Sequence, residues 1–166
     1  DQAYFEYLNI DDSAIQWLSE FSNLIITRTF SKAYGLAGLR VGYSLCSPLI
    51  ADFINRVREP FNVNFTAQVA AIAALKDDDY LSESIKVNSD GYEQLVECFK
   101  SLHLNFIPSH ANFIAVEFDD AMDIYNALLK EGVIVRPVEM SGYLRISIGT
   151  FEENAHLIAA LNKILC

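Results

Sequence analysis

The sequence lacks the features that mark membrane, nucleic-acid-binding and disulfide-rich proteins. No segment of its 166 residues approaches the roughly 18 to 20 consecutive apolar residues of a membrane-spanning helix. Basic residues are few, since 12 Lys and Arg stand against 22 Asp and Glu and give a net charge of −10. We therefore expect no membrane and no nucleic-acid partner, and we expect any anionic ligand to be held by a local group of cations.

Cysteine is scarce, and its spacing excludes two further classes of protein. Cys46, Cys98 and Cys166 form no C-x-x-C pair and have no histidines nearby at metal-ligand spacing. We therefore expect no disulfide framework, no metal site and a cytoplasmic location. Cys46 and Cys98 are predicted to pack as small hydrophobic residues.

What the sequence has in quantity is apolar side chains. Hydrophobic residues make up 52% of the chain, which is enough to build a buried core and excludes disorder. The chain begins at Asp1 rather than at a methionine. We therefore expect it to be a fragment of a longer protein.

The N-terminal part, residues 1–75, predicts too few strands for a complete domain. Continuous apolar runs indicate strands at 24–27 and 41–45, buried on both faces. Ser47 and Pro48 predict the N-cap and first residue of a helix that reaches Val57. A second helix, at 66–75, is apolar on most sides and is predicted to be buried. We expect this part to be the end of a larger α/β domain with a mostly parallel sheet.

The remainder, residues 76–166, predicts a small α+β domain. Three aspartates at 77–79 stand where a long helix begins, and their charge favours its N-terminus. Strands and helices then alternate: strands at 105–107, 112–118, 133–136 and 143–148, and helices at 121–130 and 152–165. We place the domain boundary between residues 75 and 76.

A polar loop between the first two predicted strands contains the residue types that bind phosphate. Thr29 and Ser31 offer hydroxyls, Lys32 a cation, and Arg40 a planar guanidinium that can hold a phosphate through two hydrogen bonds. The loop contains neither a Walker motif nor G-x-G-x-x-G. On these residues alone, a simple glycine-rich connection with a solvated lysine remains an equal alternative.

Two longer motifs favour a function for this loop. DQAYFEY at the start of the chain, followed about 30 residues later by TFSKAYGLAGLRVGY, resembles the pyridoxal-phosphate aminotransferases of the aspartate-aminotransferase superfamily. The resemblance implies pyridoxal 5'-phosphate as cofactor. It also implies that Lys32 forms the Schiff base with the cofactor and carries the proton during transamination.

The same resemblance implies the other cofactor contacts. Asp1 matches the carboxylate that pairs with the pyridine nitrogen, and Tyr4 matches the phenol that hydrogen-bonds the ring oxygen. Thr29, Ser31 and Arg40 match the residues that anchor the cofactor phosphate. Gln2 replaces the commoner glutamate between the two ring contacts, and we expect this change to matter little.

Within the superfamily, the sequence resembles the histidinol-phosphate aminotransferases over essentially its whole length. The matching segments include RVREPFNVN, SHANFIAVEF, EGVIVRP and YLRISIGTFEEN. This implies transamination of histidinol phosphate and 2-oxoglutarate in histidine biosynthesis, by a homodimer with a shared active site. Arg136 and Arg145 would hold the substrate anion, and Asn112 would position a loop. Both arginines lie in apolar strands, where a buried arginine without a partner would be costly, so we favour an anionic ligand over an internal salt bridge.

Several alternatives remain open at this point. An aromatic amino-acid aminotransferase or a threonine-phosphate-type decarboxylase would use the same cofactor site. A regulator with a non-catalytic, effector-sensing domain of this type is a third possibility. The roles of Tyr34, Asn62 and Asn64 are also undecided. We expect the 166-residue chain alone neither to bind the cofactor tightly nor to turn over substrate.

Overall fold

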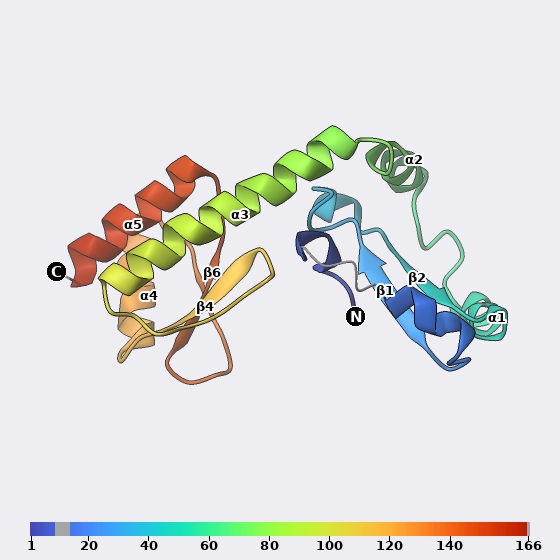
Figure 1. The fold of residues 1–166 in the computed structure, drawn as a ribbon, viewed down its shortest axis with the longest axis horizontal. Helices are drawn as coiled ribbons and strands as arrows, with labels where there is room; N and C mark the ends of the chain where they lie inside the picture. The colour runs from blue at the N-terminus through green and yellow to red at the C-terminus, as the bar shows by residue number, and fades with distance from the viewer. Residues whose placement is uncertain (9–13, 166) are drawn as a thin grey trace. The chain divides into compact units, whose positions relative to one another are not determined.

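A computed structural model describes residues 1–8 and 14–165 of the chain (Figure 1). It divides into two compact units, Asp1–Ser84 and Ile85–Cys166. The helix α3, Asp78–Ser101, begins in the first unit and continues into the second. The division therefore falls inside α3, whereas the boundary predicted at 75/76 precedes this helix and stays a prediction.

The first unit contains a pair of antiparallel strands. β1, Ile25–Thr29, pairs with β2, Gly42–Cys46, so the strands predicted here are confirmed to within two residues. The mostly parallel sheet of a larger domain stays a prediction. Burial on both faces is wrong for these strands, because Ile26 alone is buried in the pair. A ribbon of two strands has few neighbours within this unit to cover its faces.

Two α-helices follow the strands in the first unit. α1 spans Pro48–Val57 as predicted, but the Ser47 hydroxyl donates to the carbonyl of Ser22 at 3.0 Å instead of capping the helix. α2 spans Phe65–Ala74. Its predicted burial is wrong, because only two alanines are buried and Val69 is 50% exposed. Within the described part of this unit, only the small side chains of α2 find a packing surface.

Three 3₁₀ helices in the first unit were not predicted. They are η1, Phe5–Tyr7, η2, Ala14–Ser19, and η3, Ala37–Leu39. Elements this short carry no 3.6-residue hydrophobic period, so the sequence pattern cannot reveal them.

The second unit combines a sheet with helices, as predicted, and the structure shows that the sheet is antiparallel. Its strands are β3, Phe106–Ile107; β4, Phe113–Glu117; β5, Arg136–Pro137; and β6, Tyr143–Ser147. They lie in the order β3-β4-β6-β5. The helices α4, Ala121–Lys130, and α5, Phe151–Leu165, match their predicted ranges closely. The strand predicted at 133–136 is wrong for residues 133–135, because β5 contains only Arg136 and Pro137. It is an edge strand, where a proline without an N–H donor is tolerated.

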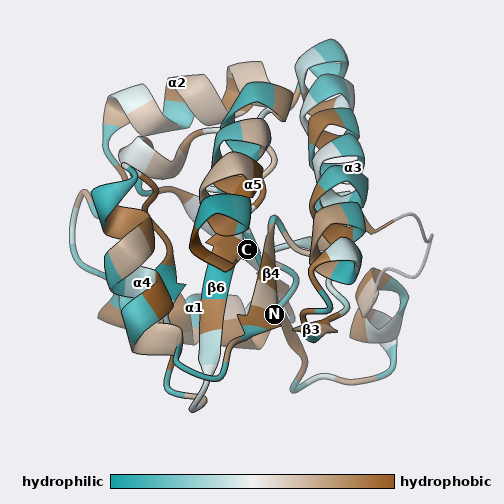
Figure 2. Ribbon diagram, turned by 90° about the vertical axis from the view of Figure 1, so that its left-hand side faces the viewer, coloured by the Kyte–Doolittle hydropathy of each residue, from teal (hydrophilic) through white to brown (hydrophobic). Residues whose placement is uncertain are grey.

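The core of the second unit lies between one face of this sheet and the helices. Ile114 and Val116 of β4 and Leu144 and Ile146 of β6 are at most 1% exposed. They pack in one cluster with residues of the three helices, namely Leu95, Phe99, Leu128, Leu157 and Leu161. Each helix alternates hydrophobic and hydrophilic residues along its ribbon (Figure 2), which is the pattern of a helix with one buried side. Cys98 is buried here, as predicted, whereas Cys46 in the first unit is only partly buried.

In the described residues, no helix combines the length and the apolar character that crossing a membrane requires. The same residues include no group of three or more His, Cys, Asp or Glu side chains that could hold a metal ion.

A close approach between α3 and the loop after β6 depends on Gly91. A Cβ atom on Gly91 would lie 2.7 Å from Ile148 Cγ2 and 2.8 Å from Asn154 Nδ2. Asn154 is 2% exposed and binds both backbone groups of Gly149: it accepts from the Gly149 N–H at 2.9 Å and donates to the Gly149 carbonyl at 3.1 Å. The loop therefore has little freedom to move away from α3.

Gly91→Ala should destabilise the protein. We expect overpacking to lower the free energy of unfolding by about 1 to 3 kcal/mol, which outweighs the gain in helix propensity of up to about 1 kcal/mol. Urea unfolding measures this change. Ser89→Ala, at an exposed position of the same helix, is the matched control and should be neutral or slightly stabilising. A Gly91→Ala variant as stable as the control would contradict the packing argument.

Candidate functional site

Two hydrogen bonds to β1 and one local bond hold the start of the chain and orient Asp1. Gln2 donates its backbone N–H to the carbonyl of Thr27 at 2.9 Å, which places the start of the chain alongside the strand. Asp1 Oδ1 accepts from the Thr27 hydroxyl at 2.9 Å and from the Ala3 N–H at 3.1 Å. No described residue donates a hydrogen bond to the other carboxylate oxygen, Oδ2. The exposed Asp1 side chain is thus oriented through one oxygen while the second remains available.

Lys32 lies on a loop that closes on itself. Phe30 is 4% exposed and packs on Tyr34 and Tyr43, with ring centroids 5.1 and 5.7 Å away. Its N–H donates to the carbonyl of Val41 at 3.2 Å, and its carbonyl accepts from the N–H of Leu36 at 2.9 Å. Buried Phe30 therefore anchors the loop, and the partly buried Lys32 stands two residues beyond it.

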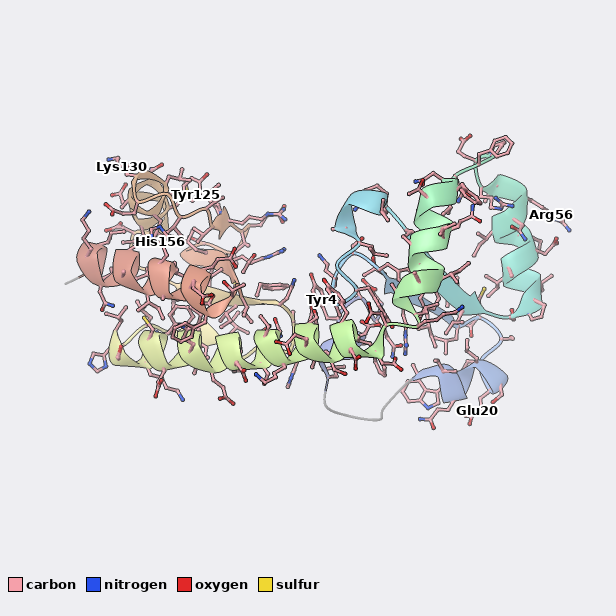
Figure 3. The ribbon with its side chains drawn as sticks, turned by 90° about the horizontal axis from the view of Figure 1, so that it is seen from above. Tyr4, Glu20, Arg56, Tyr125, Lys130 and His156 are labelled. Atoms are coloured by element: carbon pink, nitrogen blue, oxygen red, sulfur yellow. The ribbon has the colours of Figure 1, made fainter. Side chains whose placement is uncertain are left out.

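The structure brings Tyr4 and Lys32 together. Lys32 Nζ lies 5.3 Å from the centroid of the Tyr4 ring, within the range of a cation–π interaction. Tyr4 is one residue before η1 and is labelled in Figure 3. Tyr4 and Lys32, predicted from two separate motifs, thus lie beside each other in the first unit, and Asp1 precedes Tyr4 by three residues.

The predicted phosphate ligands are only partly assembled by direct contacts. Thr29 Oγ1 accepts from the Ser31 N–H at 3.0 Å, so these two residues form a local turn. Arg40 has a left-handed backbone with φ of +54° and donates through Nη1 to the carbonyl of Ala37 at 2.8 Å. Between Arg40 and the two hydroxyls, the structure shows no direct bond among the described residues.

Arg136 and Arg145 belong to the second unit and lie directly opposite each other on β5 and β6. Opposite residues of antiparallel strands share one face of the sheet, so two like charges are adjacent. The Arg145 guanidinium lies 4.2 Å from the centroid of the Phe113 ring. In the described part of the chain, neither arginine forms an ion pair with a carboxylate.

The predicted burial of the two arginines is wrong, so an energetic cost of burial does not favour an anion here. Arg136 is exposed and Arg145 is only partly buried, because β5 is the edge of the sheet and Arg145 lies on the face opposite the core. What favours an anion near them is instead the adjacency of two cations. Asn112 accepts the N–H of Ile148 at its backbone carbonyl at 3.0 Å, and its role in positioning a loop stays a prediction.

Two polar residues near the site, Thr27 and Arg28, were overlooked in the sequence. Thr27 orients Asp1, and Arg28 donates from Nε and Nη2 to Gln2 Oε1 at 3.3 and 3.1 Å. The Arg28 guanidinium also lies 4.1 Å from the centroid of the Phe5 ring. Gln2 therefore binds across to β1, although we expected the replacement of glutamate at this position to matter little. Thr27 and Arg28 could have been noticed in the sequence, because this pair of polar residues interrupts the apolar pattern of β1.

The three residues whose roles were undecided have local contacts. Tyr34 packs on Phe30. Asn62 Oδ1 accepts from Arg58 at 3.1 Å, and Asn64 caps α2 by accepting the Ala67 N–H at 2.8 Å.

Glu6 is the most perturbed carboxylate of this region. Desolvation by burial raises its pKa, while its own backbone N–H and the positive charge of Arg28 partly oppose the rise. Its Oε2 is buried without a hydrogen-bond partner among the described residues. Burial also raises the pKa of Tyr34, and the negative charge of Glu6 adds to this effect.

Comparisons with known proteins place these observations in a family. The family model described as aminotransferase class I and II matches residues 1–161. The chain is 52% identical to the histidinol-phosphate aminotransferase of Methylobacillus flagellatus and 53% identical to histidinol-phosphate aminotransferase 2 of Pseudomonas aeruginosa. Each alignment covers 99% of this chain and 46% of the relative, so the chain spans about half the length of these proteins.

A solved structure shows the same fold. The histidinol-phosphate aminotransferase of Sinorhizobium meliloti, in complex with pyridoxal-5'-phosphate, superimposes with a TM-score of 0.91 at 34% sequence identity. The match covers 99% of this chain and 47% of that one.

Replacing Glu6 with glutamine should stabilise the protein at neutral pH. A raised folded-state pKa means that the folded protein binds the proton more tightly than the unfolded chain, so the ionised carboxylate is destabilising. We expect Glu6→Gln to raise the Tm by a few degrees at pH 7. The difference should shrink as the pH falls through the folded-state pKa, where the wild-type side chain takes up its proton.

Thermal scans of the full-length protein between pH 4 and 8 measure this effect. Glu20→Gln, at an exposed position labelled in Figure 3, is the matched control and should change the Tm by less than about 1 °C. A Glu6→Gln variant less stable than wild type at pH 7 would show that the carboxylate has a stabilising partner.

Proposed function

Because the chain belongs to the class I and II aminotransferases, we propose that the whole protein is a pyridoxal-phosphate-dependent histidinol-phosphate aminotransferase. It would convert histidinol phosphate and 2-oxoglutarate into imidazole acetol phosphate and glutamate, a step of histidine biosynthesis. The proposal depends mainly on one observation: Lys32 lies beside the Tyr4 ring, in the same unit in which Thr27 orients Asp1. High identity to two proteins of this name supports the choice of substrate.

The side chains of the first unit fit the functional groups of pyridoxal phosphate. When bound, this cofactor supplies an aldehyde for covalent attachment and a ring that accepts electrons from the substrate. Lys32 offers the amine that attaches to the aldehyde. Asp1 Oδ2, which accepts no hydrogen bond from the described residues, can hold the proton of the pyridine nitrogen. The bond from Thr27 to Oδ1 fixes the direction in which Oδ2 points.

The remaining first-unit residues suit the ring oxygen and the phosphate. Tyr4 contributes a phenol close to Lys32, where its hydroxyl can bind the ring oxygen. Thr29 accepts the N–H of Ser31, which leaves the proton of its hydroxyl free to be donated to a phosphate oxygen. Ser31 and Arg40 add a second hydroxyl and a cation. We propose these three as the phosphate ligands.

In the reaction, Lys32 would also move the proton. When it is not attached to the cofactor, Lys32 Nζ would be the group that takes up a proton from the substrate and gives it back. The contact with the nearby Tyr4 ring helps to hold Nζ in position.

The paired arginines of the second unit suit a substrate with a phosphate group. A phosphate dianion would neutralise two adjacent cations that have no carboxylate partner in the described residues. We propose that Arg136 and Arg145 bind this group. By analogy with the family, we also propose a cytoplasmic homodimer with a shared active site. The 166-residue chain alone should remain inactive.

Borohydride reduction of the full-length protein with cofactor tests the role of Lys32. We expect the reduced pyridoxyl group on Lys32 and no trapping in Lys32→Ala, whose kcat should fall by at least about 10²-fold. Peptide mass spectrometry locates the modified residue. Lys76→Ala, an exposed lysine of the same unit, is the control and should be trapped normally. Modification of a different lysine would refute the assignment.

Arg145→Ala tests the substrate. Loss of hydrogen bonds to a charged group should raise the KM for histidinol phosphate by about tenfold or more, with normal trapping at Lys32. Arg56→Ala is the control, since this exposed arginine pairs with Asp52 and is labelled in Figure 3. An unchanged KM would contradict the role of Arg145. A wild-type preference for phenylalanine would instead favour the aromatic aminotransferase.

A further inference from the structure

The first turn of α3 contacts the loop that carries Lys32. We propose that Tyr80 is a positioning residue for Lys32, because its hydroxyl packs on Gly35 and supports the turn that begins at the lysine. The inference rests on the proposed role of Lys32 as the cofactor attachment site. It involves only residues of the first unit.

The turn beginning at Lys32 depends on the backbone of Gly35. The Gly35 N–H donates to the carbonyl of Lys32 at 2.9 Å and closes the turn. Gly35 has a φ of +69°, a left-handed conformation that residues with a side chain rarely adopt. Any shift of Gly35 therefore changes the carbonyl direction and backbone of Lys32 itself.

Tyr80 occupies the space where a side chain at position 35 would lie. A Cβ atom on Gly35 would overlap the Tyr80 hydroxyl and lie 3.2 Å from Cζ of the ring. Gly38, in the same loop, has no heavy atom within 4 Å of an equivalent Cβ. The contact at Gly35 is thus specific and is not a general consequence of crowding in the loop.

Tyr80 is itself held in place by the start of α3. Its N–H donates to Asp77 Oδ1 at 3.0 Å, and the next N–H, of Leu81, donates to the Asp77 carbonyl. These two bonds fix the direction of the helix at the point where Tyr80 leaves it. Burial raises the pKa of the Tyr7 phenol, and Ser84, one turn further along α3, lowers it, so Ser84 lies near this side chain.

The same two turns of α3 therefore support both sides of the lysine site. Tyr80 contacts the turn of Lys32, while Ser84 lies near the side chain of Tyr7 at the end of η1, the element that directly follows Tyr4. Lys32 Nζ and the centroid of the Tyr4 ring, which belong to these two segments, lie 5.3 Å apart. The relative position of amine and phenol then depends on a rigid helix rather than on two independent loops.

Four variants of the full-length holoenzyme test the contact: Gly35→Ala, Tyr80→Phe, the double variant, and Gly38→Ala as the matched control. We expect Gly35→Ala to lower kcat about tenfold with a KM change below about threefold, and to shift the pH midpoint of the visible band of the bound cofactor. Tyr80→Phe alone removes the supporting hydroxyl and should lower kcat about threefold, whereas Gly38→Ala should remain within about twofold of wild type.

The double variant provides the decisive comparison. Removing the Tyr80 hydroxyl makes room for the new methyl group, and the ring, which is 50% exposed, can move by the few tenths of an ångström still needed. We expect the kcat of Gly35→Ala/Tyr80→Phe to be at least about threefold higher than that of Gly35→Ala. The pH midpoint of the visible band should be restored only partly, since the left-handed backbone still disfavours alanine. A double variant as impaired as Gly35→Ala, or an equal defect in Gly38→Ala, would overturn the proposal.

Hydrogen exchange separates this inference from the function on which it rests. The amides at positions 35 and 36 should exchange faster in Gly35→Ala than in wild type. In the double variant they should exchange more slowly again, with or without cofactor. If wild type fails to trap the cofactor at Lys32, the proposed function is wrong, and exchange still decides whether Tyr80 holds the turn. If trapping succeeds and exchange is unaffected, the contact has no positioning role.

Discussion

The pairing of β1 with β2 is the constraint on which the lysine site depends. The two strands hold both ends of the Lys32 loop, because Thr29 lies opposite Gly42 and Phe30 bonds Val41 just beyond the last pair. Gly42 permits this register, since a Cβ there would lie 2.7 Å from the carbonyl oxygen of Arg28. The close approach of the strands thus sets the length and shape of the loop between them.

β1 also positions the other half of the site. The N-terminal segment follows its outer edge through the bond from Gln2 to Thr27, and the Thr27 side chain then orients Asp1. The contact between Arg28 and Gln2 reinforces the same alignment from the next residue of the strand. A single short strand therefore connects the predicted pyridine contact with the loop of the predicted attachment site, although the two motifs lie about 30 residues apart.

Local patterns in the sequence predicted the helices well. Pro48 marks the start of α1, and the apolar period of α4 and α5 gives their ranges, because both signals act within a few residues. The contacts that build the site were not predictable in this way. Thr27 with Asp1 and Tyr80 with Gly35 join residues far apart in the chain, and neither pair has a periodic or compositional signature. The candidate residues came from motif resemblance, and their geometry came from the structure.

Burial was the property that the sequence predicted least well, and in each case the sequence overestimated it. An apolar helix such as α2 and an arginine in an apolar strand such as Arg136 both suggest burial, yet both are exposed in the units described.

For the arginines, exposure changes the reason to expect an anionic ligand. Two solvated cations opposite each other on β5 and β6 repel only modestly, by a few tenths to about 1 kcal/mol, so the fold can retain them without a partner. An anion bound between them would remove this repulsion and would stabilise the second unit by mass action. If the proposed role is right, the anion site would be preformed, and its small cost in the free protein would be recovered on binding.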